Sequence, residues 1–129
     1  MYAAALDPRI AACVVSGHFM ESTRKMVMPS PHYTAYIEVV ENYAFFSGQA
    51  TDFADADVCS LICPRPVHIE QGREDRVAYW KVAQDEFQVV QGYYARLGLR
   101  ERATFEVFEG GHVVAGKEGF TFLEKWLKP

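Results

Sequence analysis

Two polar residues that each follow a glycine turn are the strongest candidates for chemistry in this chain. Asp75 comes three residues after Gly72, which ends an apolar run, and His112 comes directly after Gly110 and Gly111. On neighbouring parallel strands, residues just past the carboxyl ends lie within hydrogen-bond reach. An aspartate that holds one ring nitrogen of a histidine leaves the other free to take a proton from a nucleophile. The pattern predicts an acid–base pair; a loop histidine and a solvated turn aspartate remain the alternative.

The elements that must position this pair alternate between strands and helices. Apolar and β-branched runs predict strands, and apolar residues spaced three and four apart predict helices. Strands that alternate with helices imply right-handed crossovers, a parallel sheet and an α/β fold. The expected strands are Ile10–Ser16, the part of Ile62–Gly72 that follows Pro66, and Thr104–Phe108; the expected helices are Tyr2–Leu6, Thr34–Phe46, Val58–Ile62, Trp80–Leu97 and Gly116–Leu127.

Composition narrows the classes of function. The 129 residues are half apolar and 23% charged, with a net charge of −4, which is typical of one globular domain. The absence of a Lys/Arg run argues against a nucleic-acid partner, and no apolar run approaches the roughly 18 residues of a membrane span. The N-terminus lacks the pattern of a signal peptide, so a cytoplasmic location is favoured. The three cysteines, Cys13, Cys59 and Cys63, predict buried thiols and neither a disulfide framework nor a zinc site.

Five short segments in order resemble the C-terminal half of an α/β-hydrolase, over about residues 4–127. The branch that they resemble most is the esterase branch related to dienelactone hydrolases and acetyl xylan esterases. This resemblance implies that Asp75 is the triad acid, that His112 is the base, and that the substrate is a small ester. The segments are Ala5–Ile10, Val15–Gly17, Leu61–Pro66, Glu70–Gly72 with Asp75, and Phe108–His112.

The chain departs from that family at the nucleophile. Such enzymes carry a serine in a Gly-x-Ser-x-Gly elbow between a strand and a helix, and no such motif occurs in these 129 residues. In that family the elbow lies at the start of a helix, and Tyr2–Leu6 resembles the end of that helix. We therefore expect residues 1–129 to be the C-terminal part of a single hydrolase domain, inactive without the missing serine. Ser16 ends a strand at the right edge, but a hydrogen bond to nearby backbone is its expected use.

Three further groups of polar residues could have either a functional or a structural role. His18 and His32 flank the variable region after the first strand, which in this family lines the pocket mouth, so His18 is a candidate for substrate contact. His68 lies within a strand and is expected to be a hydrogen-bonded core histidine rather than a metal ligand. The D-x-x-D-x-D cluster at 52–57 lacks the spacing of a calcium loop, and helix capping and solvation explain it better. No metal or cofactor is expected.

Two other functions stay open. The chain could be a non-catalytic α/β module used for association, or the C-terminal part of a serine peptidase of the prolyl-oligopeptidase type, which has the same order of acid and histidine. In a partial sheet, the apolar strand Ile10–Ser16 would be an unpaired edge. That edge predicts either a homodimer that covers it or marginal stability.

Overall fold

Three parallel strands form the centre of the molecule in the computed structural model, which describes residues 1–27, 48–49 and 51–128. The strands are β1 (Cys13–Ser16), β2 (Val67–Gly72) and β3 (Ala103–Phe108), in that spatial order. Val15 pairs with Ile69, which pairs in turn with Phe105. The predicted parallel α/β sheet is confirmed, whereas the helix expected at 34–46 lies outside the described residues.

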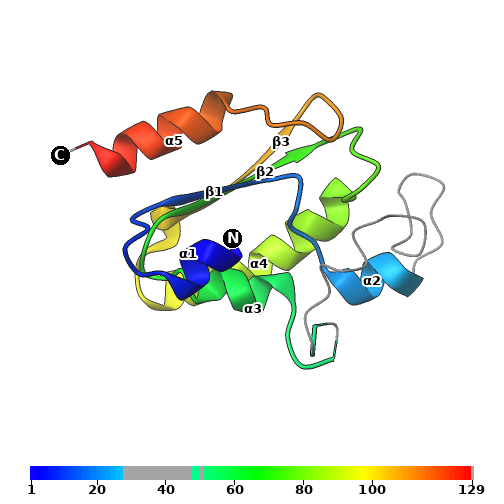
Figure 1. The fold of residues 1–129 in the computed structure, drawn as a ribbon, viewed down its shortest axis with the longest axis horizontal. Helices are drawn as coiled ribbons and strands as arrows, with labels where there is room; N and C mark the ends of the chain where they lie inside the picture. The colour runs from blue at the N-terminus through cyan, green and yellow to red at the C-terminus, as the bar shows by residue number, and fades with distance from the viewer. Residues whose placement is uncertain (28–47, 50, 129) are drawn as a thin grey trace.

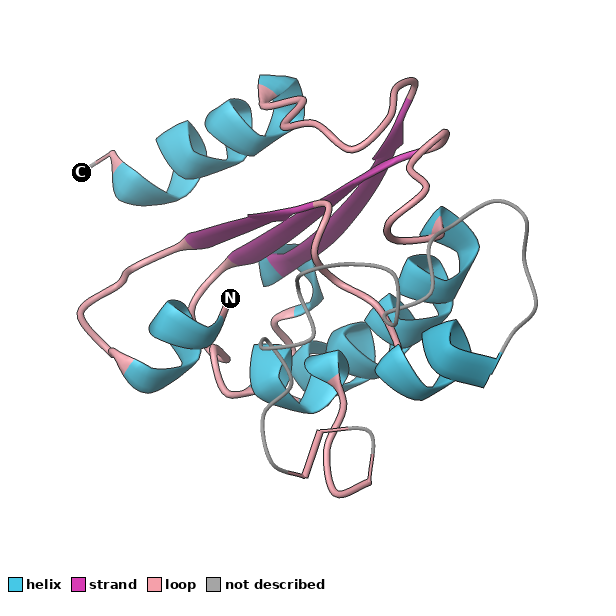
Figure 2. Ribbon diagram, turned by 45° about the vertical axis from the view of Figure 1, so that its right-hand side comes forward, coloured by secondary structure: helices cyan, strands magenta, loops and turns pink. Residues whose placement is uncertain are grey.

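Helices cover both faces of the sheet (Figures 1 and 2). One face lies under α5, and the opposite face packs on α1, α3 and α4 (Figure 1). A short 3₁₀ turn, Arg100–Arg102, leads into β3. The helices are α1 (Tyr2–Leu6), α2 (Ser22–Val27), α3 (Asp55–Ser60), α4 (Trp80–Arg96) and α5 (Lys117–Leu127).

The longest helix, α4, packs its apolar face against the core beneath the sheet, as the spacing of its apolar residues predicts. Phe87 and Val90 are buried there, and the Phe87 ring stacks on Phe105 of β3 at 5.3 Å between centroids. Tyr94 is fully buried, and its hydroxyl donates a hydrogen bond to the Arg65 carbonyl oxygen at 2.6 Å. The helix therefore fixes the segment that enters β2.

The first strand is shorter than predicted because a side chain forms hydrogen bonds with the backbone of the segment that leads into it. The Arg65 guanidinium donates to the carbonyl oxygens of Ala4, Asp7 and Ile10 at 2.7 to 3.0 Å. The chain from α1 is thereby held by an arginine instead of a neighbouring strand, and pairing begins only at Cys13.

The acidic segment after residue 50 also differs from expectation. Asp57 accepts a hydrogen bond from the Ala54 N–H, which is the expected capping role, and α3 begins at Asp55 instead of Val58. Asp55 is not solvated: it is 3% exposed and accepts from the Met20 N–H at 3.1 Å. Burial raises the pKa of this carboxyl group. Two of its donors, the Met20 N–H and the Tyr2 hydroxyl, lie 35 and 53 residues away in the sequence, so no local pattern could have indicated these contacts.

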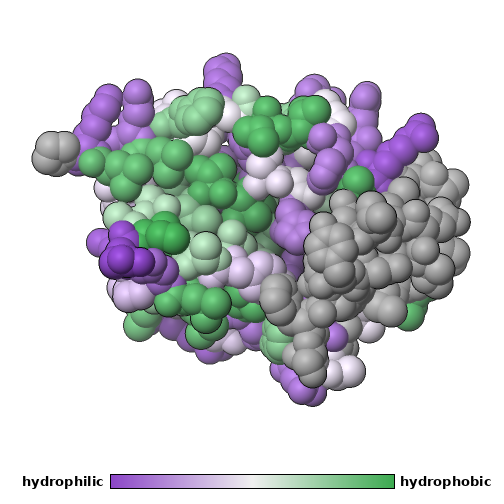
Figure 3. All heavy atoms as spheres, in the orientation of Figure 1, coloured by the Kyte–Doolittle hydropathy of each residue, from purple (hydrophilic) through white to green (hydrophobic). Residues whose placement is uncertain are grey.

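Apolar side chains gather on the face shown in Figure 3, across the region between α5 and α1. Leu6 of α1 and Phe120 of α5 are 81% and 67% exposed. Within the described residues, β1 pairs only with β2, so its other edge is open. The homodimer expected to cover this edge stays a prediction. Among the described residues there is no helix with the length and apolarity that a membrane span requires.

Candidate active site

Asp75 is held in place by the turn that follows β2. Its Oδ1 accepts hydrogen bonds from the Val77 N–H at 2.7 Å and the Ala78 N–H at 3.2 Å. Its Oδ2 accepts from the Gln71 side-chain amide at 2.8 Å. The side chain is fully buried, so these donors replace the water that an ionised carboxylate needs.

His112 completes the arrangement from the end of the neighbouring strand. Its Nδ1 lies 3.0 Å from Asp75 Oδ2, within hydrogen-bond range. About half of the His112 side chain is exposed, and within the described residues its Nε2 makes no hydrogen bond. An imidazole whose Nδ1 proton is held by a carboxylate presents the Nε2 lone pair outward as a base.

Close packing of two loops brings the pair together. A Cβ on Gly72 would overlap the Gly111 carbonyl oxygen and lie 2.6 Å from that of Gly110, so only glycine allows this approach. The Arg73 N–H donates to Phe108 O, and the Glu74 N–H donates to Gly110 O, both at 2.9 Å. These bonds join the loop that carries Asp75 to the loop that carries His112.

The end of β1 supports the same site. Gly17 has a φ of +62°, and a Cβ there would lie 3.1 Å from both Cε1 and Nδ1 of His112 and 3.4 Å from Asp75 Oδ2. The carboxyl ends of all three strands therefore converge on one place, as expected for a parallel sheet.

A cavity of about 440 Å³ lies at the turn that carries Asp75. Residues of the turn after β2 line this cavity, and Asp75 is one of them. Arg73 stacks over the Trp80 ring, with the guanidinium carbon 5.0 Å from the ring centroid. The other lining residues are Arg73, Glu74, Arg76 and Tyr79.

Two solved esterases have a similar structure. A carbohydrate esterase family 15 glucuronoyl esterase from Caldicellulosiruptor kristjansonii matches 97% of this chain with a TM-score of 0.70 and 17% sequence identity. An esterase from Pyrococcus furiosus matches 98% of it with a TM-score of 0.58 and 12% identity. No family model matches the sequence, and no curated protein does.

The fold is part of an α/β-hydrolase fold. The chain spans 39% of the length of the glucuronoyl esterase and 48% of the length of the Pyrococcus furiosus esterase. The finer resemblance to dienelactone hydrolases and acetyl xylan esterases stays a prediction.

Within this partial hydrolase fold, the other sequence candidates take different places. Ser16 donates its hydroxyl to the Val113 carbonyl oxygen at 3.3 Å, which confirms the structural use expected of it. His18 is exposed and follows Gly17, which lies against the His112 ring. His32 lies outside the described residues. In the part of the chain that the structure describes, no serine or cysteine is hydrogen-bonded to His112.

The cysteines occupy structural positions. Cys13 and Cys59 are buried, as predicted, while Cys63 is partly exposed. Burial raises the pKa of the Cys59 thiol to about 12, which removes its reactivity as a thiolate at neutral pH.

Gln71 is the site residue that the sequence interpretation missed. It is fully buried, and its side-chain amide donates to Asp75 Oδ2 and to the Ala78 carbonyl oxygen, both at 2.8 Å. It points to the same face of β2 as Val67 and Ile69, which belong to the core. A polar residue in such a core-facing register needs hydrogen-bond partners, and that signal could have identified it.

Proposed function

We propose that this chain supplies the acid and the general base of a serine hydrolase that acts on carboxylic esters. The observation that carries the proposal is the 3.0 Å distance between His112 Nδ1 and Asp75 Oδ2, on a His112 side chain that is about half exposed. Nε2 would take the proton of a serine hydroxyl as it attacks the ester carbonyl, and would then return it to the alcohol leaving group. Asp75 would stay ionised and stabilise the imidazolium between these steps.

The ester class is supported by the two structural neighbours, because both are esterases. The cavity lined by the turn that carries Asp75 is our candidate place for part of the ester. His18 is exposed at the end of β1, next to the glycine that backs His112, which makes it our candidate for substrate contact. A His18→Ala change is then expected to raise KM more than it lowers kcat.

The serine and the oxyanion donors would come from outside these 129 residues. The sequence contains no Gly-x-Ser-x-Gly motif, and the matched esterases are more than twice as long as the part that this chain covers. The open edge of β1 is where a further strand of the same sheet could pair. Residues 1–129 would then form the C-terminal part of one domain, without activity of their own, because the nucleophile and the oxyanion stabilisation are absent.

The test is an ester-hydrolysis assay of two proteins: the 129-residue chain, and the product of the same reading frame extended through its upstream coding sequence. We expect an upstream serine elbow, hydrolysis of 4-nitrophenyl acetate by the longer protein, and none by the chain alone. In the longer protein His112→Ala should lower kcat by about 10³-fold or more. Lys117→Ala, at an exposed position on α5, is the matched control and should leave kcat within about twofold.

Two results would contradict the proposal. An upstream frame without a serine elbow would remove the nucleophile from the scheme. Full esterase activity in the His112→Ala variant would show that this histidine is not the base.

A further inference from the structure

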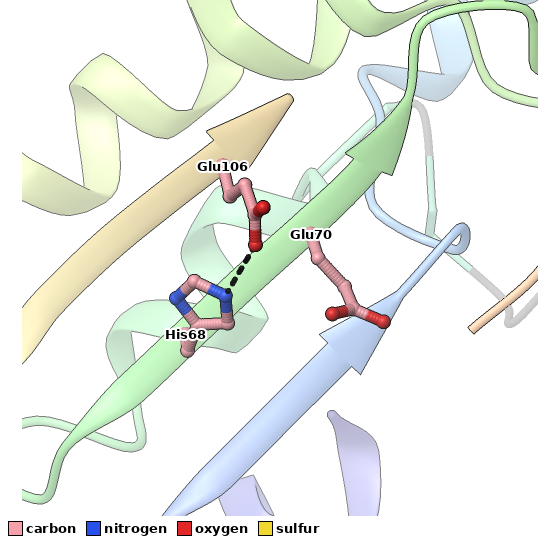
Figure 4. A group of neighbouring side chains, drawn as sticks. All are labelled: His68, Glu70 and Glu106. Atoms are coloured by element: carbon pink, nitrogen blue, oxygen red, sulfur yellow. Dashed lines mark ion pairs between the residues drawn. The ribbon is translucent and has the colours of Figure 1, made fainter. Parts of the chain in front are cut away.

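A second histidine lies beside two carboxylates on the face of the sheet that α5 covers. His68 and Glu70 project from β2, and Glu106 projects from β3 toward them (Figure 4). They share this face because residues two apart on a strand point the same way, and the register pairs Glu70 with Glu106. One potential ligand atom from each residue lies within 4.8 Å of the other two.

The histidine is buried with one nitrogen unused. Its side chain is 5% exposed, and its Nδ1 lies 2.8 Å from the Thr104 hydroxyl. Its Nε2 is 3.6 Å from Glu106 Oε2, too far for a hydrogen bond, and neither atom has a hydrogen-bond partner among the described residues. The expectation of a fully hydrogen-bonded core histidine is therefore only half met. A buried nitrogen without a partner costs free energy, so its alignment with two carboxylates calls for an explanation.

The third ligand candidate is rigidly placed. Glu70 is fully buried, and its carboxylate accepts hydrogen bonds from the Ala115 N–H at 2.9 Å and the Gly116 N–H at 3.0 Å. Each carboxylate oxygen has two lone pairs, so these bonds leave room for a further ligand interaction. A neutral imidazole is the form that coordinates a metal.

We propose that His68, Glu70 and Glu106 form a binding site for one divalent transition-metal ion of the zinc type. One imidazole nitrogen and two carboxylates are ligands that such ions accept, at about 2.0–2.2 Å. Two ligands at that distance in a tetrahedron lie about 3.4 Å apart, close to the 3.6 Å between His68 Nε2 and Glu106 Oε2. Thr104, bonded to the other ring nitrogen, would fix the orientation of the ring.

A route to the site exists from solvent. A cavity of about 440 Å³ between β3 and α5 has His68 and Glu106 in its wall, and the Glu106 side chain is 24% exposed. Through this opening a water molecule or a small ligand could approach a bound ion. Glu118 also lines the cavity, but it does not belong to the group of three ligand atoms.

The bound ion would connect the sheet to the loop that follows His112. Glu70 already accepts hydrogen bonds from the backbone of Ala115 and Gly116. The metal would join its carboxylate to His68 on β2 and to Glu106 on β3. This role concerns stability and does not depend on the proposed esterase function.

The experiment is titration of metal-free protein with Zn²⁺ in a calorimeter and with Co²⁺ in a visible spectrometer. We expect one equivalent of each to bind, and the Co²⁺ form to show the absorption of a four- or five-coordinate ion. Glu106→Gln keeps the size of the side chain and should weaken binding at least tenfold. Glu118→Gln, on the rim of the same cavity, and His112→Ala, in the other histidine pair, should bind as the unaltered protein does.

Three outcomes would overturn the proposal: no stoichiometric binding, undiminished binding by Glu106→Gln, or loss of binding in His112→Ala. Should Glu106→Gln fail to fold, ¹H–¹⁵N correlation spectra of the unaltered protein decide the matter. Zn²⁺ must then shift the ring nitrogens of His68; a shift confined to another histidine would contradict the proposal.

Discussion

The two histidine–carboxylate arrangements of this sheet differ in which partner is buried. At the strand ends Asp75 is buried with both oxygens hydrogen-bonded, and His112 is about half exposed. On the sheet face His68 is buried, its Nε2 has no hydrogen-bond partner in the part of the chain that the structure describes, and Glu106 is the partly exposed partner.

The reason lies in the backbone around each pair. At the strand ends the loops bend to bring N–H donors to the carboxylate, and glycines let them approach. On the face the strand register fixes the positions of the side chains and leaves 3.6 Å between His68 and Glu106. The first geometry suits proton transfer and the second suits an ion between the partners.

The largest expected effect comes from breaking the strand-end pair. In an active longer protein, Asp75→Asn should lower kcat by about 10³- to 10⁴-fold, because an amide does not stabilise the imidazolium and favours the wrong tautomer of His112. The measurement is kcat for 4-nitrophenyl acetate, with Lys117→Ala as the control. A loss of less than tenfold would mean that Asp75 is not the orienting acid.

The next effect concerns the contact between the two loops. Gly72→Ala would force a Cβ into the Gly111 carbonyl oxygen and should reduce the free energy of unfolding by about 3 kcal/mol or more. Gly92→Ala is the matched control, because no atom of the described residues outside its own helix backbone and chain neighbours lies within 4 Å of a Cβ there. Alanine also stabilises the interior of α4, by about 0.5–1 kcal/mol. Urea unfolding measures both changes. Equal stability of the two variants would contradict the close approach of the loops.

A smaller effect separates positioning from catalysis. Gln71→Met keeps the volume but removes the donor to Asp75 Oδ2 and to Ala78 O, at a cost of about 1–3 kcal/mol of stability. In the active protein it should lower kcat while KM stays nearly constant, because the change reaches the substrate only through Asp75. A change in KM alone would point to a substrate contact instead.

The smallest expected effect concerns Glu86, a carboxylate that lies outside both histidine–carboxylate arrangements. Glu86 accepts the Ala56 N–H at 2.8 Å, and burial is the main cause that raises its pKa. A raised folded-state pKa means that the charged form costs stability, a cost that appears as pH rises above about 4.5. Glu86→Gln keeps the acceptor and should raise the Tm by a few degrees at pH 7. The gain should vanish near pH 4; an equal gain at both values would contradict a charge effect.

The sequence predicted the parts of this account that depend on local patterns. The apolar spacing from Trp80 predicted α4, and the two glycine turns predicted that Asp75 and His112 would lie at the same edge. Contacts between distant segments were missed. The bond from Gln71 to Asp75 and the gap between His68 and Glu106 depend on turn geometry and on the register of β2 against β3. The spacing of residues along one strand predicts neither property.

The measurement that tests the central claim most directly is the tautomer of His112. Two-bond ¹H–¹⁵N correlation spectra of the neutral ring show which nitrogen carries the proton. The account predicts a proton on Nδ1, facing Asp75, and an unprotonated Nε2, with this preference lost in Asp75→Asn. A neutral His112 protonated on Nε2 would contradict it, because that nitrogen then could not accept a proton from a nucleophile.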